Sequence, residues 1–216
     1  MNMQVGFMIS VILNILGFVL TVVGTIVMVK GIDADEYLGG KGLSALKYFT
    51  VQSNLLYGTY AGIFAVFELI YGSADTMPAV LYIIKYVLTV GVTLTMLTVL
   101  FYLAPVVQKS YPPLFKGANL YFHLLVPLLG AISFCFFEKG AVISFQQVFL
   151  GLIPFGIYAA FYSVNSLSHA ENGRVSKEYD WYCFLSKGTN KGVISFMIML
   201  VAAFAICLGL WFINSL

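Results

Sequence analysis

Four polar side chains within five consecutive positions interrupt an apolar stretch of the sequence, and their chemistry stands out. Thr50, Gln52, Ser53 and Asn54 follow the segment Lys47-Tyr48-Phe49 and precede a long apolar run. A segment that enters lipid keeps such groups only if they find partners inside a helix bundle. We therefore interpret this stretch as one wall of a polar site.

These side chains share one face if the segment is a helix, because Thr50, Ser53, Asn54 and Tyr57 are spaced i, i+3, i+4 and i+7. A threonine hydroxyl is a weak nucleophile alone and becomes a competent one when an adjacent base takes its proton. Histidine is the usual base, because its ordinary pKa lies near neutral pH. The stretch thus predicts a nucleophile that needs a histidine from elsewhere in the chain.

One of the two histidines, His123, lies within an apolar run. It is four residues after Asn119 and four before Pro127, whose missing N–H frees the carbonyl of His123 one turn back. We expect this helix to be distorted at the histidine. Asn54 or Asn119 could orient the imidazole or donate to a developing oxyanion, as amide side chains do in known enzymes.

The composition places these residues in a membrane. The chain has 216 residues, of which 61% are hydrophobic and 9% charged, whereas soluble domains carry about 25% charged residues. Apolar runs of about 20 residues are long enough to span a bilayer. We predict a single all-α domain, an integral membrane bundle of six transmembrane helices over about residues 3–29, 46–70, 78–103, 119–137, 141–166 and 191–213. The first run lacks the pattern of a signal peptide, so we expect it to be retained.

Charge and cysteine content argue against several other functions. A net charge of +2 is too small, and its residues too scattered, for a nucleic-acid surface. Cys135, Cys183 and Cys207 have no metal-ligand or CxxC spacing. We expect them to be unpaired packing residues, and we expect neither a metal nor a cofactor.

The fifth predicted helix ends in a polar ladder of Tyr158, Tyr162, Asn165 and His169. Its tyrosines could line the site or could simply belong to the interfacial aromatic belt. The loop that follows is the longest in the chain, and loops of that length are usually functional or disordered. It contains four aromatic residues: Tyr179, Trp181, Tyr182 and Phe184. We expect this loop to form a cap on the membrane surface.

The basic residues predict the orientation. Nine of the eleven lie in or beside the first, third and fifth loops. They are Lys30, Lys41, Lys47, Lys109, Lys116, Arg174, Lys177, Lys187 and Lys191. The positive-inside rule then makes these loops cytoplasmic, in a cytoplasmic membrane that we expect to be bacterial, and places both termini outside. Thr50 and His123 would each lie about 6 Å below this interface, near the end of the fifth helix.

Two charged residues, Glu68 and Lys85, lie inside predicted spans at similar depth. We expect a structural ion pair, or Lys85 extending to the headgroups. An alternative function is a small-molecule or ion transporter with Glu68, Lys85 and His123 as coupling residues, although no pair of broken helices in corresponding halves supports it. Haem binding through His123 and His169 is a third possibility.

At these residues the chain also resembles a known family, the androgen-induced and androgen-dependent multipass proteins, and their bacterial six-helix relatives. The resemblance rests on Lys47-Tyr48-Phe49-Thr50, Asn54, His123 and, more loosely, Asp180-Trp181-Tyr182. Around His123 the chain matches the bacterial relatives better than the animal enzymes. The animal proteins are threonine hydrolases of fatty acid esters of hydroxy fatty acids. The resemblance therefore implies a six-helix fold and a catalytic pair of Thr50 and His123.

The residues and the resemblance together predict an intramembrane lipid-ester hydrolase that takes its substrate from the bilayer. Thr50 and His123 are its predicted catalytic residues. The predicted orienting or substrate-binding residues are Asn54, Asn119, Ser53, Tyr162, Asn165 and Trp181.

Overall fold

The computed structural model describes residues 3–32, 42–72, 76–108, 110–139, 143–171, 174–176, 178–182, 184–185 and 189–216. Four of the basic residues that predict the orientation, Lys41, Lys109, Lys177 and Lys187, lie outside these ranges, as does Cys183.

Within the described residues, six helices are long and apolar enough to cross a membrane. The first three spans are α1 (Met3–Lys30), α2 (Phe49–Tyr71), and α3 (Ala79–Thr98) with its π-helical extension η3 (Val99–Gln108). The fourth span joins α4 (Ala118–Leu120), η5 (Tyr121–Leu125), α5 (Val126–Ile132) and η6 (Ser133–Phe137). The fifth joins α6 (Phe145–Val148), η7 (Phe149–Leu152) and α7 (Ile153–Ser168), and the sixth is α8 (Thr189–Ser215). The predicted all-α, six-helix membrane fold is confirmed.

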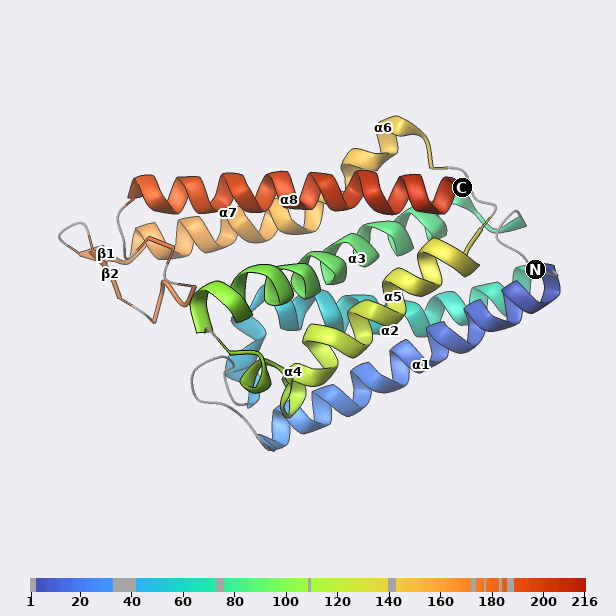
Figure 1. Cartoon of the computed structure of the whole chain (residues 1–216), viewed down its shortest axis with the longest axis horizontal. Coiled ribbons are helices and arrows are strands. Elements are labelled where there is room, and N and C mark those ends of the chain that lie inside the picture. The colour runs from blue at the N-terminus through green and yellow to red at the C-terminus, as the bar shows by residue number, and fades with distance from the viewer. Residues whose placement is uncertain are drawn as a thin grey trace.

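Short elements connect some of these spans. A 3-10 helix, η1 (Gly42–Lys47), precedes α2, and another, η4 (Pro112–Phe115), precedes α4. Strands β1 (Ala170–Glu171) and β2 (Arg174–Val175) pair antiparallel after α7. Figure 1 shows this hairpin at one end of the molecule and both chain termini at the other.

Two spans begin three or more residues later than predicted. The second span begins at Phe49 rather than near residue 46, because residues 42–47 form the 3-10 turn η1. The fifth begins at Phe145 rather than near residue 141. At this start Ser144 and Gln147 form a capping box that satisfies the first backbone N–H groups. The distortion predicted at His123 is confirmed, since the turn Tyr121–Leu125 that contains it is π-helical.

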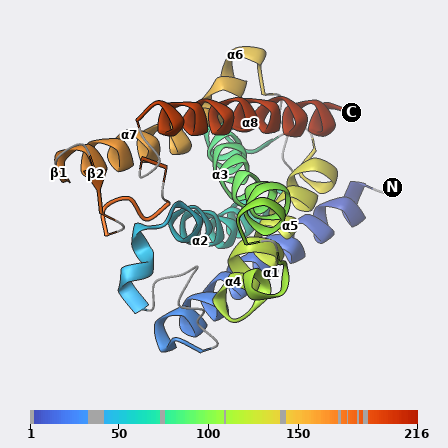
Figure 2. The same cartoon turned by 60° about the vertical axis from the view of Figure 1, so that its left-hand side comes forward.

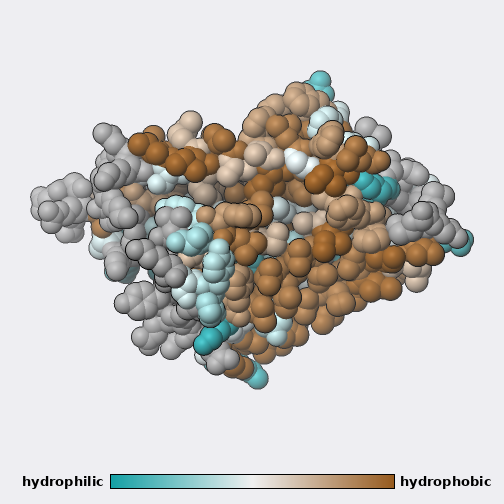
Figure 3. All heavy atoms as spheres, viewed as in Figure 1, coloured by the Kyte–Doolittle hydropathy of each residue, from teal (hydrophilic) through white to brown (hydrophobic). Residues whose placement is uncertain are grey.

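Helix α3 occupies the centre of the bundle. It contacts α2, α5, α7 and α8 and is the most buried of the six spans. Helix α1 packs on the α2 and α5 side, and α7 and α8 cover the opposite side (Figures 1 and 2). In Figure 3 apolar side chains cover the middle of the visible face, while polar ones gather toward its ends, as a lipid-facing surface requires.

Helices α1 and α2 approach closely where Gly58 faces Thr21. A Cβ atom on Gly58 would lie 2.0 Å from the Thr21 hydroxyl oxygen, which is far inside van der Waals contact. Small residues at helix contacts let backbones approach in this way inside membranes. The glycine therefore sets the separation of the first two spans.

Gly58→Ala should lower the free energy of unfolding by about 1–3 kcal/mol, because the added methyl overpacks the contact with Thr21. Thermal unfolding in detergent measures the loss. The matched control is Gly209→Ala in α8, where a Cβ would meet nothing within 4 Å. Adding Thr21→Ala should restore part of the stability; equal stability of Gly58→Ala and Gly209→Ala would contradict the close contact.

Candidate functional site

Thr50 is the second residue of α2 and lies in its first turn. Thr50 is therefore nearer to the start of the helix than the sequence predicts, because α2 begins three residues later than expected. Its side chain is half-buried, and its hydroxyl makes no hydrogen bond to any residue within the described ranges. The hydroxyl is thus not committed to a structural partner there.

His123 is buried in the π-helical turn of the fourth span, with 4% of its surface exposed. Its Nδ1 lies 2.8 Å from the carbonyl oxygen of Leu114 in η4. A carbonyl oxygen only accepts hydrogen bonds, so Nδ1 must carry the proton and Nε2 is the unprotonated nitrogen of the neutral ring. The contact with Leu114 therefore fixes the tautomer that a general base needs.

Asn54 ties the first turn of α2 to the histidine's helix. Its Nδ2 donates to the backbone oxygens of Thr50, at 2.7 Å, and Phe122, at 2.9 Å. Phe122 immediately precedes His123, so one amide nitrogen joins the backbone of the predicted nucleophile to the residue next to the predicted base. Both amide hydrogens are used in these bonds, so Asn54 positions the two helices and has no hydrogen left for an oxyanion.

The other two polar candidates near this point have different surroundings. Ser53 is buried and its hydroxyl lies 3.3 Å from that of Thr95, so it faces α3. Asn119 is half-buried one turn before His123, and its side chain has no hydrogen-bond partner among the described residues. Asn119 is therefore the amide that remains available for an oxyanion.

The aromatic loop lies over the start of α2, as the sequence predicts. Trp181 donates its indole N–H to the Tyr158 hydroxyl at 3.0 Å, and Tyr158 donates in turn to the Lys47 carbonyl at 2.7 Å. The Tyr182 hydroxyl accepts the Phe49 backbone N–H at 3.0 Å. Burial raises the pKa of the Tyr182 phenol well above its ordinary value, so this contact stays uncharged. The loop therefore covers the turn that carries Thr50.

Tyr162 holds this loop in place. Its hydroxyl bonds to the buried Asp180 carboxylate, which also accepts the backbone N–H groups of Phe184 and Leu185, each at 3.0 Å. The Tyr162 hydroxyl is thus used to anchor the cap. The side chain of Asn165, one turn later in α7, is half-buried and has no hydrogen bond within the described part of the chain.

The two histidines have separate environments. The exposed His169 ring stacks on Tyr179 with centroids 3.8 Å apart, and its Nδ1 lies 2.8 Å from the carbonyl oxygen of Asn165. His123 is buried in the fourth span. Each ring is engaged by its own neighbours, and this arrangement gives no support to haem ligation by the pair.

A second polar cluster lies at the other end of the bundle, and the predicted pairing there is wrong. The Lys85 Nζ lies 3.4 Å from Glu138 Oε1, and no ion pair joins it to Glu68 in the described ranges. Asn14 lies between the two carboxyl groups and donates to Glu68 at 3.1 Å and to Glu138 at 3.0 Å. Lys85 is fully buried, so it does not extend to the headgroups.

Sequence reasoning misses Glu138 because it lies just beyond the fourth predicted span, 119–137. The π-helical turn η6 (Ser133–Phe137) ends directly before it, and the Glu138 side chain is buried, with 2% exposed. The available signal was Ser10 and Asn14, polar residues one turn apart in the first span. Thr50 and Glu68 are separated by 18 helical residues, or about 27 Å, so the two polar regions are distinct.

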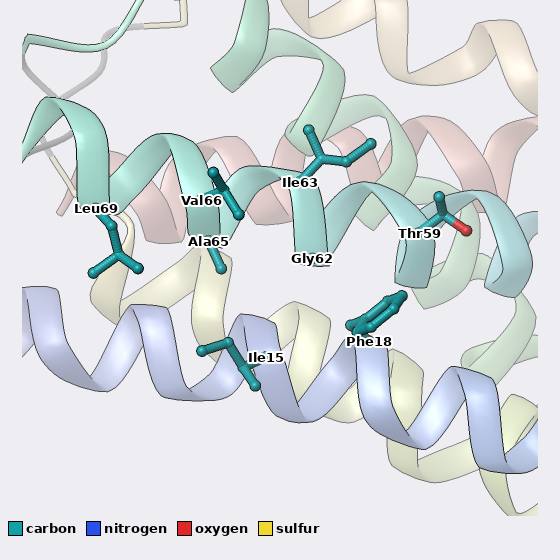
Figure 4. A pocket seen from close by; sticks show the side chains of 8 residues that line it. All are labelled: Ile15, Phe18, Thr59, Gly62, Ile63, Ala65, Val66 and Leu69. Atoms are coloured by element: carbon teal, nitrogen blue, oxygen red, sulfur yellow. The ribbon is translucent and has the colours of Figure 1, made fainter.

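An apolar groove of about 380 Å³ lies on the outer surface between α1 and α2 (Figure 4). Ile15 and Phe18 line it from α1, and residues between Thr59 and Leu69 line it from α2. Thr59 is nine residues, or two and a half turns, beyond Thr50, so the two threonines point to opposite sides of the helix. The groove therefore does not lead to the candidate site.

Comparison with protein-family models, with curated proteins and with solved structures found no match for this chain. Of the predicted site residues, the structure brings the backbones around Thr50 and His123 together through Asn54, and brings Trp181 and Tyr162 into the cap above them.

Proposed function

We propose that the protein is an intramembrane lipid-ester hydrolase with Thr50 as nucleophile and His123 as general base. The observation that carries this proposal is the pair of hydrogen bonds from Asn54 to the backbones of Thr50 and Phe122. The hydrogen bond between His123 Nδ1 and the Leu114 carbonyl also supports the proposal, because it leaves Nε2 as the proton acceptor. The resemblance in sequence points to the same two residues.

In the proposed reaction the Thr50 oxygen attacks the ester carbonyl carbon while its proton passes to His123 Nε2. The tetrahedral intermediate collapses, the alcohol leaves with the proton from the imidazolium, and an acyl-threonine ester remains. Water then attacks this ester while its proton passes to His123, and the imidazolium returns a proton to the departing Thr50 oxygen as the fatty acid is released. Asn119 is the side chain that would donate to the oxyanion in both steps.

A site near the interface suits a lipid ester as substrate. Its acyl chains stay in the hydrocarbon while the polar ester reaches the first turn of α2. The resemblance favours fatty acid esters of hydroxy fatty acids. The cap of Tyr158, Trp181 and Tyr182 over Lys47 and Phe49 would limit the access of water to the acyl intermediate.

A fluorophosphonate probe tests the nucleophile directly, because it forms a stable adduct with an activated hydroxyl. We expect mass spectrometry to map the adduct to Thr50, and labelling to be lost in Thr50→Ala and His123→Ala. Thr59→Ala is the matched control, since Thr59 is exposed on the opposite side of the same helix. An adduct on another residue, or undiminished labelling of Thr50→Ala, would contradict the proposal.

Transport is a second candidate, favoured by one observation, the buried charged residues Glu68 and Lys85. An ionisable residue within a membrane span marks a functional site by default. Uptake of solutes by protein-containing vesicles, without fluorophosphonate labelling, would favour transport over hydrolysis.

The proposed orientation places the first, third and fifth loops in the cytoplasm of a bacterial cell. A cysteine at Ser215 should then react with an impermeant reagent in intact cells, and one at Ser176 should not, in a background with Cys183 replaced by serine. Both positions are exposed. The opposite labelling pattern would reverse the orientation.

A further inference from the structure

The buried charged cluster draws polar side chains from four spans into one network. Ser10 and Asn14 come from α1, Tyr57 and Glu68 from α2, Lys85 from α3, and Ser133 and Glu138 from the end of the fourth span. All of them are at least nine-tenths buried. The network is therefore built into the packing of the bundle, and it is independent of the proposed ester site.

The hydrogen bonds fix the orientation of its central residue. Lys85 has only donors, and it bonds to Asn14 Oδ1 and, at 3.0 Å, to the Tyr57 hydroxyl. The other end of the Asn14 amide is then the NH₂ group, which donates to Glu68 Oε2 and Glu138 Oε1. One neutral amide thus separates two carboxyl groups and accepts from the ammonium.

The formal charges of this cluster do not cancel. It holds one ammonium, on Lys85, and two carboxyl groups, on Glu68 and Glu138, so full ionisation leaves one uncompensated negative charge. Such a charge is strongly unfavourable in a low-dielectric interior. One additional positive charge, either a proton or a bound cation, is needed for neutrality.

The oxygen atoms around the cluster do not suit a metal cation. Glu68 Oε1 is hydrogen-bonded to the Ser10 hydroxyl and Oε2 accepts from Asn14, while Glu138 Oε1 accepts from Asn14, Ser133 and Lys85. Glu138 Oε2 is left without a partner in the described structure, whereas a hard cation needs about six oxygen ligands. No group of three or more His, Cys, Asp and Glu side chains suited to a metal occurs among the described residues. The missing charge is therefore a proton.

The two carboxyl groups have different hydrogen-bond partners, and these favour a different protonation state in each. Three donors converge on Glu138 Oε1, including the ammonium at 3.4 Å, and this arrangement stabilises a carboxylate. Glu68 has no ammonium contact within the described ranges, and its Oε1 lies 2.5 Å from the Ser10 hydroxyl. A hydroxyl can donate to a carboxylate or accept from a carboxylic acid, so Ser10 can satisfy Glu68 in either state.

We propose that this cluster is a proton-binding site, in which Glu68 holds one exchangeable proton and donates it in a hydrogen bond to Ser10. Protonation adds one proton from water to a Glu68 oxygen and changes the charge of the cluster from −1 to 0. The titratable groups that interact with Glu68 are Tyr57 of α2, Lys85 of α3 and Glu138 of the fourth span. Tyr60, Tyr82 and Cys135 lie near Glu138 in the same cluster. Helix α1 contributes the uncharged Ser10 and Asn14.

The position of the site favours exchange with the aqueous phase on the side of the termini. Glu68 lies one turn before Tyr71, the last residue of α2, and Glu138 directly follows η6. Loss of the proton would leave a buried negative charge where α1, α2, α3 and the fourth span meet, so these helices should separate or admit water there. Proton binding and the packing of this end of the bundle are thus coupled.

Infrared difference spectroscopy of the purified protein tests the site. At neutral pH we expect a C=O stretching band from a buried protonated carboxyl group, which shifts on transfer to heavy water. Glu68→Gln should abolish this band, whereas Asp180→Asn, at the buried carboxylate of the other end, should leave it unchanged. A band that persists in Glu68→Gln, or one that does not shift in heavy water, overturns the proposal.

Ser10→Ala is a second test, because this variant leaves Glu68, Lys85 and Glu138 in place. Removing the hydroxyl deprives the Glu68 proton of its acceptor, so the band should remain and change in frequency. If Ser10 were only structural, its replacement would not change the frequency of the C=O stretching band. An unchanged band in Ser10→Ala therefore refutes the assignment of the proton to the Glu68 and Ser10 pair.

Discussion

Thr50→Ala should lower the turnover of a lipid ester by at least about 10²-fold, because it removes the atom to which the acyl group is transferred. His123→Ala should cause a loss of about 10²–10⁴-fold, the usual contribution of a general base. The double variant should lose little more than the worse single variant, because nucleophile and base act as one unit. Hydrolysis of a fluorogenic fatty acyl ester in detergent or vesicles measures all three.

Two matched variants separate chemistry from packing. Thr50→Ser keeps a hydroxyl and should retain measurable turnover, while Thr59→Ala, at an exposed threonine of the same helix, should act as the parent does. The thermal midpoint of Thr50→Ala should stay close to that of the parent, because its hydroxyl has no structural partner in the described ranges. Parental turnover in Thr50→Ala, or losses that multiply in the double variant, would contradict the mechanism.

Lys85→Met should lower the free energy of unfolding by about 3–5 kcal/mol, since it leaves the buried Glu138 carboxylate without its ammonium partner. Glu68→Gln should cost much less, because an amide resembles the protonated carboxyl group that the proposal places there. Thermal or denaturant unfolding in detergent gives both values. The matched control is Lys116→Met at an exposed lysine, which should stay within about 0.5 kcal/mol of the parent.

The double variant Lys85→Met/Glu138→Gln identifies the partner of the lysine. It removes both charges together, so it should be more stable than Lys85→Met alone. Lys85→Met/Glu68→Gln should show no such recovery, because Glu68 makes no direct ion pair with Lys85 in the described ranges. If the losses at Lys85 and Glu138 simply add, the two residues are not coupled.

The sequence by itself determined the fold class and the number of spans. The bilayer requires about 20 apolar residues for each helix, and that requirement is local and can be read from hydropathy alone. It also determined the distortion at His123, since Pro127 removes a backbone donor regardless of its surroundings. The position of the aromatic loop over the start of α2 followed from the order of the elements and from where the basic residues lie.

Only the tertiary structure decided which polar groups meet. Glu68 and Lys85 are at similar depth, yet the lysine pairs with Glu138 because helix rotation and the π-helical turn η6 bring that carboxylate inward. The sequence predicts that Asn54 faces a substrate or the imidazole, but the contact between α2 and η5 directs its amide to two backbone oxygens. Depth in the membrane follows from counting residues along one helix. The facing partner depends on the rotation and register of several helices, which arise only when side chains from distant segments pack together.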